Sequence, residues 1–220
     1  VAILDKFTEL TTELTAELTT ELTTRKKQYA FYREQLLAFE DTKLQPSERI
    51  ATVGANCNSP CTVWKTLGEV GEFIRGGGLQ KKDFTETGVG CIHYGQIYTH
   101  YGTYADKTKT FVSKEFAKKA RMAKHGNLII ATTSENDEDV CKAVAWLGQE
   151  EIAISSDACF FAHSMNPKYF AYFFQTENFQ KQKRPFITGT KVRRVNANDL
   201  AKIKIPIPPL SEQERIVEIL

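Results

Sequence analysis

The chain has 220 residues, of which 41% are hydrophobic and 25% charged, and its formal net charge is +2 at pH 7. This size and composition suit one folded domain of medium size with an appendage, and they argue against intrinsic disorder. The longest apolar runs are far shorter than a membrane span and the first residues do not resemble a signal peptide, so we expect a cytoplasmic protein that binds no membrane.

The first predicted element is one long helix over residues 1–40, about 38 residues and roughly 57 Å in length. Residues 8–24 read TELTTELTAELTTELTT, a unit of four residues repeated four times. Because four residues exceed the 3.6 residues of an α-helical turn, the leucine stripe shifts around the helix by about 40° per repeat. On either side of the repeat, apolar residues recur at intervals of three and four, as in a coiled coil. The residues expected to contact a partner helix are Leu10, Leu14, Leu18, Leu22, Tyr29, Tyr32, Leu36 and Phe39.

The composition of this helix indicates that it needs a partner. Threonine is a weak helix former, and the glutamates of the repeat face one another at the unfavourable i, i+4 spacing. We therefore expect two copies of the chain to associate through residues 1–40. The alternative is a solvated low-complexity helix whose repeat length is accidental.

Residues 41–62 form a predicted linker, because they contain proline, glycine and many asparagine and serine residues. Residues 63–205 follow as a predicted mixed α/β domain, which makes the fold class of the chain α+β. Short β-rich runs that contain or adjoin turn residues, such as 126–131 and 152–155, support this assignment.

A helix is predicted to begin at Asn166 and Pro167. Asparagine is a preferred N-cap residue, and proline is favoured in the first helical turn. Phe170, Phe173 and Phe174 then fall on one face, which most simply indicates packing into a core.

The C-terminal segment, residues 206–220, is predicted to contain a turn and a second helix. The prolines of 206–209 are expected to break any strand or helix. Ser211 with Glu214 then forms a predicted capping box, so the helix is expected to start near Glu212. The last residues resemble the first four, as they would in a longer arrangement of helix, domain, helix, domain.

Nucleic-acid binding has the strongest local evidence. Between Asn178 and Asn198 there are basic residues and no acidic ones, interleaved with aromatic and hydrogen-bonding side chains. Positive groups bind phosphates, while Arg, Asn, Gln and Thr recognise base edges. A second basic run at 114–124 gives weaker support, and the alternative is an ordinary solvated charged surface. The basic residues of the first segment are Lys181, Lys183, Arg184, Lys191, Arg193 and Arg194.

Residues 91–102 are unusually rich in planar hydrogen-bonding side chains, with three tyrosines, two histidines and one glutamine. They could line a binding groove, or they could form the edge of a β-hairpin whose rings pack locally. No nucleophile with a fixed general base is visible there, which disfavours a hydrolytic site.

No convincing catalytic, cofactor or metal site is predicted. Residues 166–169, Asn-Pro-Lys-Tyr, approximate the Asn/Asp-Pro-Pro-Tyr loop with which amino-methyltransferases hold a flipped adenine, but the second proline is absent. Residues 75–78, Arg-Gly-Gly-Gly, are better interpreted as a turn than as a phosphate-binding loop. Of the five scattered cysteines, only Cys57 and Cys61 are close in sequence, and a zinc site would need two more ligands.

Several motifs, taken in order, resemble the specificity subunit (S or HsdS) of type I restriction-modification systems over nearly the whole chain. The longest are RKKQYAFYREQLLAF at 25–39, TTSENDEDVCKAVAWLG at 132–148 and DLAKIKIPIPPLSEQERIVEIL at 199–220. Further support comes from LDKF at 4–7, the Thr-x-Glu-Leu repeats, WKTLGEV at 64–70, HYGQIYTHYG at 93–102 and NPKYFAYFFQT at 166–176. Each motif is modest alone, but their order is highly specific.

This resemblance implies a subunit with two target-recognition domains, each recognising half of a split DNA site, separated by conserved helices that pair antiparallel. Two modification (methyltransferase) subunits bind such a subunit, and restriction subunits complete an ATP-dependent nuclease, so catalysis belongs to the partners. This chain departs from that pattern, because it has one recognition domain and only the start of a second conserved helix. It therefore resembles a half-subunit, a truncation or a fragment, and a homodimer would favour a palindromic split site.

Two other classes of function remain open: a stand-alone adenine methyltransferase or nuclease, and a coiled-coil assembly protein without DNA specificity. If the chain recognises double-stranded DNA, one added tetrad would move two recognition domains by up to about 6 Å and 40°, against about 3.4 Å and roughly 35° per base pair. The helix is then expected to set the spacing between half-sites. The residues expected at the DNA are Arg75, Lys81, Lys82, His93, Tyr94, Gln96, Tyr98, His100, Tyr101, Thr133, Ser134, Thr188, Lys191, Arg193 and Arg194.

Overall fold

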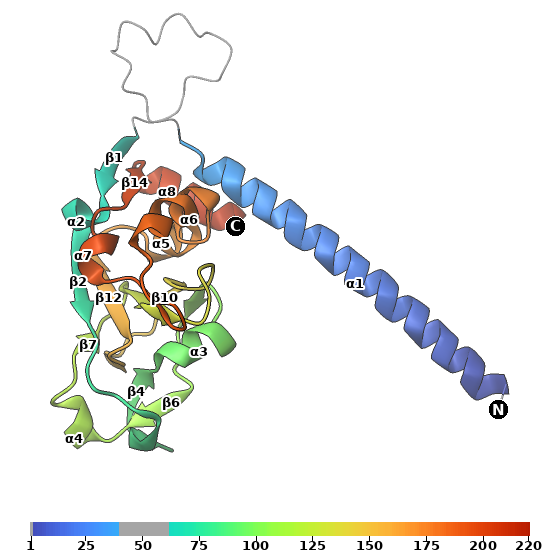
Figure 1. Ribbon diagram of the computed structural model, residues 1–220, viewed down its shortest axis with the longest axis horizontal. Coiled ribbons are helices and arrows are strands. Elements are labelled where there is room, and N and C mark those ends of the chain that lie inside the picture. Colours follow the sequence, from blue (N-terminus) through green and yellow to red (C-terminus); the bar gives the residue numbers. More distant parts are fainter. Residues whose placement is uncertain (1, 40–61) are drawn as a thin grey trace, which may run out of the picture. The chain divides into compact units, whose positions relative to one another are not determined.

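The computed structural model describes residues 2–39 and 62–220 (Figure 1). The long N-terminal helix and the remainder of the chain form two compact units, and each is described by itself. Among the helices in these ranges, none combines the length and apolar character needed to cross a lipid bilayer.

Helix α1 (Ala2–Leu37) confirms the predicted long helix. Its end corrects the prediction, because the N–H of Ala38 bonds to the carbonyl of Gln35 three residues earlier, which closes the helix before Phe39. The leucines of the repeat are each more than half exposed. The threonine hydroxyls donate to the carbonyl four residues earlier, as Thr15 does to Thr11 at 2.7 Å, so the repeat satisfies its own side-chain donors.

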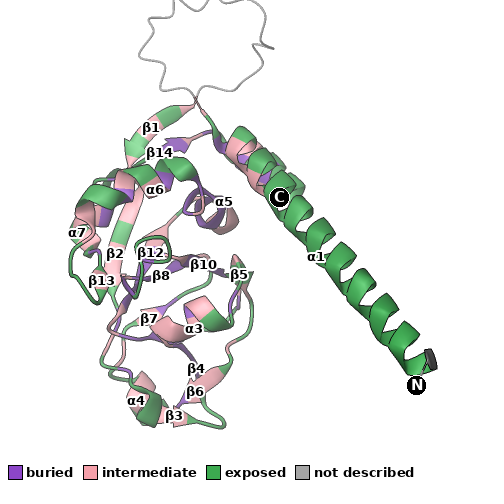
Figure 2. Cartoon of the chain, turned by 45° about the vertical axis from the view of Figure 1, so that its right-hand side comes forward, coloured by how far each residue is buried: buried purple, intermediate pink, exposed green. Residues whose placement is uncertain are grey.

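The domain contains two five-stranded sheets, and the first has the strand order β2-β12-β8-β10-β5. Its neighbouring strands are antiparallel except for β10 and β5. Strand β8 confirms the strand predicted within 126–131, and β8 and β10 are buried throughout (Figure 2). The strands are β2 (Gly71–Arg75), β5 (Tyr104–Ala105), β8 (Leu128–Ala131), β10 (Ala143–Trp146) and β12 (Ala158–His163).

The second sheet has the order β3-β6-β4-β11-β7, in which only β4 and β11 are parallel. Strand β11 confirms the strand predicted within 152–155. The strands are β3 (Phe84–Thr85), β4 (Val89–Ile92), β6 (Thr110–Val112), β7 (Met122–Ala123) and β11 (Ile152–Ile154).

The main core lies between the two sheets. Ile129 and Phe160 of the first sheet pack in one cluster with Ile92 and Ile154 of the second. Side chains alternate across a strand, so the neighbouring residue Cys91 belongs to a second cluster that helix α4 (Lys114–Ala117) covers. The central strands β4 and β11 of the second sheet are therefore covered on both faces.

Residues 75–78 do not form the predicted turn. The chain continues extended from β2 toward the second sheet, where Gly77 forms a parallel bridge with Ser155. The N–H groups of Gly76 and Gly77 donate to Ala158 and Ile154 at 2.9 and 2.8 Å. A side chain on Gly76 would overlap the carbonyl oxygen of Ser155, so the glycines permit this close approach between the sheets.

A small antiparallel sheet joins β1 (Val63–Thr66) to β14 (Lys204–Ile207). Strand β14 runs through Pro206, which corrects the prediction that these prolines break any strand. The N–H of Leu67 donates to the carbonyl of Ile203, so these two residues form a hydrogen-bonded pair in the same register. Hydrogen-bonded and non-hydrogen-bonded pairs alternate along an antiparallel ladder, so Pro206 lies in a non-hydrogen-bonded pair and its nitrogen faces away from β1. No ladder bond is lost at that position.

Helix α5 (Pro167–Phe173) begins as predicted, because Asn166 Oδ1 accepts the N–H groups of Lys168 and Tyr169. The three phenylalanines predicted for its buried face are all buried. Helix α5 packs on β8 and β10, and α6 (Glu177–Lys183) and α7 (Ala197–Leu200) lie toward the same end of the domain (Figure 1).

Helix α8 (Leu210–Ile219) starts two residues before the predicted position, so Ser211 lies inside the helix and caps nothing. The carbonyl of Pro209 accepts the N–H groups of Glu212 and Gln213 and makes the first turn. The buried amide of Gln213 ties the helix to the domain, since it accepts from Asn166 N–H and donates to the Pro208 carbonyl.

Residues 94–99 form a short helix, α3 (Tyr94–Thr99), and not the edge of a β-hairpin. His93 caps it: the ring nitrogen Nδ1 accepts Gly95 N–H, and the backbone N–H of His93 donates to Gln96 Oε1 at 2.9 Å. This reciprocal arrangement is a capping box formed by His93 and Gln96 in place of the usual Ser or Thr and Glu. The aromatic composition of the segment did not indicate it.

Candidate nucleic-acid interface

Two short strands that are distant in sequence bring predicted DNA-binding residues together. Strands β9 (Thr133–Ser134) and β13 (Arg193–Arg194) pair antiparallel, with Ser134 opposite Arg193 and Thr133 opposite Arg194. Thr188 joins them because its backbone exchanges two 2.9 Å hydrogen bonds with Arg194. These two paired strands, together with Thr188, are called the ledge. The next residue, Val195, is buried, and its N–H donates to the Thr132 carbonyl at 3.1 Å.

A polar cleft of about 270 Å³ lies beside β9 and β13. Arg75 is fixed at its rim, because its Nε atom donates to the Ser156 carbonyl at 3.0 Å. Arginine offers donors to phosphates and to guanine, whereas carboxylate, amide and hydroxyl groups complement other base edges. The cleft residues with such side chains are Arg75, Thr132, Thr133, Ser156, Asp157, Thr188, Arg194 and Asn196.

Four of these residues, Thr132, Ser156, Asp157 and Asn196, are not among the contacts predicted from the sequence. Asp157 lies in the turn between β11 and β12, where nothing in the local sequence indicates a binding role. Asn196 caps α7 by accepting Asp199 N–H at 2.9 Å, and an Asn-x-x-Asp pattern could have revealed the cap but not the cleft. Ser156 lies in the same turn as Asp157 and also lines the cleft.

Helix α3 is hydrogen-bonded to strand β9 of the ledge. The Tyr98 hydroxyl donates to the Thr133 carbonyl at 2.8 Å, and burial raises the pKa of this phenol. Gln96 is occupied by the helix cap and by Thr110. Tyr101 is buried and its hydroxyl accepts Lys109 N–H at 2.8 Å. These three predicted contact residues therefore have structural partners.

The other members of this segment are more accessible. His100 is exposed, while His93 and Tyr94 are partly exposed with their rings 4.6 Å apart. The pKa of His93 is lowered, first by burial and then by the positive charge of Lys81. Because Nδ1 of His93 accepts the Gly95 N–H, the neutral ring has its hydrogen on Nε2 and offers a donor there.

A second basic surface is formed by lysines near the short 3-10 helix η1 (Lys81–Asp83) and α4. Lys81 and Lys82 of η1 are exposed, as are Lys118 and Lys119 after α4. Leu79 and Phe84 beside η1 pack in the same apolar cluster as residues of α4, which brings these lysines to one region. Arg121 connects the region to the cleft, because it donates to the Arg75 carbonyl at 2.9 Å.

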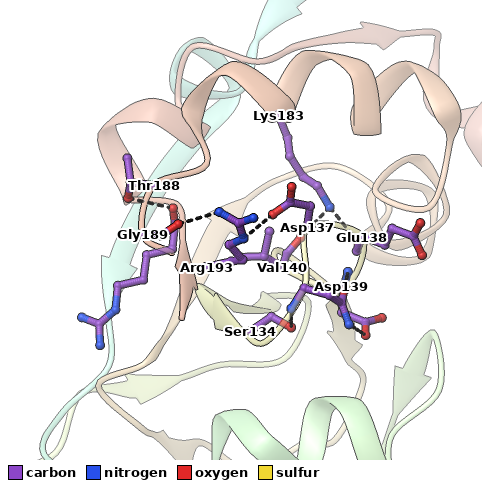
Figure 3. A network of polar contacts seen from close by, with 11 residues as sticks. Ser134, Asp137, Glu138, Asp139, Val140, Lys183, Thr188, Gly189 and Arg193 are labelled. Atoms are coloured by element: carbon purple, nitrogen blue, oxygen red, sulfur yellow. Dashed lines mark hydrogen bonds and ion pairs between the residues drawn. The ribbon is translucent and has the colours of Figure 1, made fainter. Parts of the chain in front are cut away.

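Lys183 is one of the six basic residues of the 178–198 segment, but it does not face solvent. It is fully buried at the end of α6, and its Nζ atom donates to the carbonyls of Glu138 and Val140 at 2.8 and 2.7 Å (Figure 3). Burial lowers the pKa of this lysine. Lys183 fixes the acidic loop 135–139 and is not available to a phosphate.

Arg193 also has partners within the protein. Its Nε atom lies 2.7 Å from Oδ1 of Asp137, and an Nη atom donates to the Gly189 carbonyl at 2.6 Å. Lys191 and Arg194 are exposed, and within the described ranges no carboxylate lies at ion-pair distance from either. The segment is free of acidic residues in sequence, but the fold brings Asp137 against it.

No metal cluster is found in the described part of the chain: no three His, Cys, Asp or Glu residues there are arranged to hold an ion. The pair Cys57 and Cys61 lies outside the described residues. Cys91, Cys141 and Cys159 are buried free thiols, and burial raises the pKa of each.

Comparison with known proteins identifies the family. The type I restriction modification DNA specificity domain matches residues 63–220, and the chain belongs to this family. The EcoR124I/EcoR124II specificity subunit of Escherichia coli is 30% identical over 227 residues, which cover 100% of this chain and 50% of that protein. A putative type I specificity subunit of Haemophilus influenzae, S.HindORF215P, is 29% identical over 238 residues and is covered to 51%. The chain thus spans about half the length of these relatives.

Solved structures support the fold. The HsdS subunit of Thermoanaerobacter tengcongensis aligns with a TM-score of 0.57 at 17% identity, covering 94% of this chain and 46% of that one. A structure from a study of type I system assembly aligns at 0.52 and 18% identity, with 94% and 48% covered. The predicted α+β fold with a long N-terminal helix is confirmed.

Proposed function

We propose that this chain recognises one half of a split DNA site as part of a type I restriction-modification complex and catalyses no reaction itself. The observation that carries the proposal is the ledge of β9 and β13 beside the polar cleft, where arginines from two distant segments meet hydroxyl, amide and carboxylate groups. Hydrogen-bond donors and acceptors beside positive charge suit the recognition of bases and phosphates in DNA. The proposed location of this complex is the cytoplasm.

Each predicted residue except Arg193, whose partners are described above, then has a role that follows from its exposure. Arg75 and Arg194 at the cleft contact bases or phosphates, and Thr133 and Thr188 offer hydroxyl groups from its walls. The exposed cations and the exposed or partly exposed rings away from the cleft contact the DNA backbone; these are Lys81, Lys82, His93, Tyr94, His100 and Lys191. The buried or engaged residues Gln96, Tyr98, Tyr101 and Ser134 support this surface.

Catalysis is assigned to partner subunits, namely modification subunits and ATP-dependent restriction subunits. The relatives are named as specificity subunits of restriction enzymes, which supports this division of labour. The Asn-Pro-Lys-Tyr segment gives no support to methyl transfer by this chain. Its Asn166 oxygen already accepts two backbone N–H groups at the start of α5, so it is not free to hold an adenine.

Helix α1 is proposed to pair with a second copy of itself and to set the distance between two half-sites. The exposed leucines of its repeat are the basis of this proposal. A dimer is expected in sedimentation at tens of micromolar, and a monomer would contradict it. Deletion of residues 13–16 should change the spacer between half-sites and leave the half-site bases unchanged; altered half-site bases would contradict the spacing role.

The recognition itself is tested by selection from random-sequence duplexes, using the chain together with its modification subunit. We expect one short half-site to be enriched, repeated as a palindrome if the chain dimerises. No enrichment by the complex would favour an assembly protein without DNA specificity. Methyl transfer or cleavage by the purified chain alone would favour an enzyme.

A further inference from the structure

Arg193 is a predicted DNA-binding residue that already has partners within the protein, because Asp137 and Gly189 bind its guanidinium group (Figure 3). We propose that Asp137 is a specificity-determining residue, which retains Arg193 within the protein and so prevents it from binding DNA phosphates of any sequence. The inference rests on the proposed function and assigns different roles to the two adjacent arginines of β13.

The ion pair of Arg193 and Asp137 is accessible enough for a DNA phosphate to compete with the Asp137 carboxylate for the guanidinium group. The side chain of Arg193 is 34% exposed and that of Asp137 is 53% exposed. Ion pairs at this exposure are weak, and a phosphate is as good an acceptor for a guanidinium group as a carboxylate. Arg193 stays with Asp137 in the presence of DNA only if the carboxylate is held in place.

The loop that carries Asp137 is held on both sides. The buried ammonium group of Lys183 donates to the carbonyls of Glu138 and Val140, as described above. Within the loop, Asn136 Oδ1 accepts Asp139 N–H, and Asn136 Nδ2 donates to the Asp139 carboxylate, both at 2.7 Å. Asp137 lies between these fixed points, so little entropy is lost when it binds Arg193.

Strand geometry separates the two arginines. Consecutive side chains of a strand point to opposite faces, so Arg193 reaches the acidic loop while Arg194 lines the cleft. Arg193 acts as a positioning residue: with Ser134 opposite it in β9, it fixes the ledge from which Arg194 contacts DNA.

The consequence for specificity follows from how non-specific binding arises. Non-specific complexes depend on phosphate contacts, and one added contact steepens the slope of log affinity against log salt by about 0.9. A released Arg193 would add such a contact to any duplex. The affinity for the half-site duplex would increase less than the affinity for other duplexes, because half-site binding also depends on the ledge that Arg193 fixes.

The test compares two variants of equal charge, Asp137→Asn and Glu138→Gln. Glu138 is exposed in the same loop and contributes its backbone carbonyl, but it forms no bond with Arg193. Affinities of the chain with its modification subunit are measured between 50 and 200 mM salt for the selected half-site duplex and for a scrambled duplex. We expect Asp137→Asn to raise scrambled-duplex affinity about threefold or more at low salt, with a slope steeper by about one, and to narrow the preference for the half-site.

Glu138→Gln should change the affinities for the two duplexes slightly and to the same extent. Equal effects of the two variants on affinity and slope would overturn the inference. A wild-type complex that shows no preference between the duplexes would overturn the proposed function instead.

A second measurement tests the pair without DNA. Unfolding of wild type, Asp137→Asn, Arg193→Gln and the double variant is followed by tryptophan fluorescence. The inference predicts a coupling of about twofold or more in the unfolding equilibrium constant. No coupling would overturn it whatever the DNA results.

Discussion

Helix α1 and the domain use the same residue types in opposite ways. Leu10, Leu14, Leu18 and Leu22 are more than half exposed, whereas Leu128 of β8 is completely buried. Threonines in α1 bond to their own helix, whereas Thr133 and Thr188 bring their hydroxyl groups to the cleft. The helix is defined by local bonds and by its length, while the domain is defined by contacts between distant segments.

Stability and recognition chemistry therefore reside in different parts of the chain. The helix has local bonds but leaves its leucines in water, so its stability should respond to helix propensity and to association. The domain has its own core and uses buried polar groups such as Lys183 and Gln213 to fix loops and helices. Both tryptophans, Trp64 and Trp146, belong to residues 62–220, so tryptophan fluorescence measures domain unfolding separately from the helix.

The largest expected effect comes from Lys183. Replacement by alanine removes the donor to two carbonyls and leaves a cavity, so we expect the free energy of unfolding of the domain to fall by about 3 kcal/mol or more. Lys181→Ala, at an exposed position of the same helix, should change it by less than about 0.5 kcal/mol. Chemical denaturation followed by tryptophan fluorescence gives both values, and a similar small loss in the two variants would contradict the role assigned to Lys183.

The second effect is a loss of domain stability in mild acid. His163 packs against Phe161 and Phe170, and burial lowers its pKa to about 4. The unfolded chain takes up the proton near its ordinary pKa of about 6.5, so stability is full above pH 6.5 and falls as the pH drops toward 4. We expect this group to remove about 3 kcal/mol over that window, with no further loss from it below pH 4.

The control for this effect is His163→Asn, which keeps an acceptor near the N–H of Met165 but does not titrate. Its denaturation free energy should fall less steeply between pH 6.5 and 4 than that of the wild type. Identical pH dependence in the two proteins would show that another group dominates.

The smallest stability effect concerns helix α1. Replacing Thr11, Thr15 and Thr19 by alanine should strengthen the helix by about 0.5 kcal/mol per site, because alanine has the higher helix propensity. Circular dichroism should then show a higher melting temperature for the helical signal, while the fluorescence transition of the domain stays unchanged. Serine at the same positions keeps the hydroxyl groups and should give little gain. A shift of the domain transition would mean that the two regions do not behave independently.

Local patterns in the sequence predicted what local forces determine. The four-residue repeat predicted α1, β-rich runs predicted β8 and β11, and the Asn-Pro pair predicted the start of α5. In each case, neighbouring residues contain the whole signal, whether helix periodicity, β propensity or a side-chain cap.

The sequence could not predict what depends on contacts between distant residues. The pairing of β9 with β13, and the bond from Arg193 to Asp137, join segments that are far apart along the chain. The burial of Lys183 depends on two carbonyls in another loop, so its charge alone pointed to solvent. The strand through Pro206 was missed because the bonding register of β14 cannot be read from composition.

DNA recognition is proposed to take place at the ledge and the cleft beside it. Arg194→Gln removes an exposed cation that lines the cleft, whereas Lys107→Gln removes an exposed cation that does not. The measurement is the affinity of each variant, with its modification subunit, for the selected half-site duplex. We predict that Arg194→Gln weakens binding by roughly tenfold or more and that Lys107→Gln has little effect. Equal affinity of the two variants for that duplex would contradict the account.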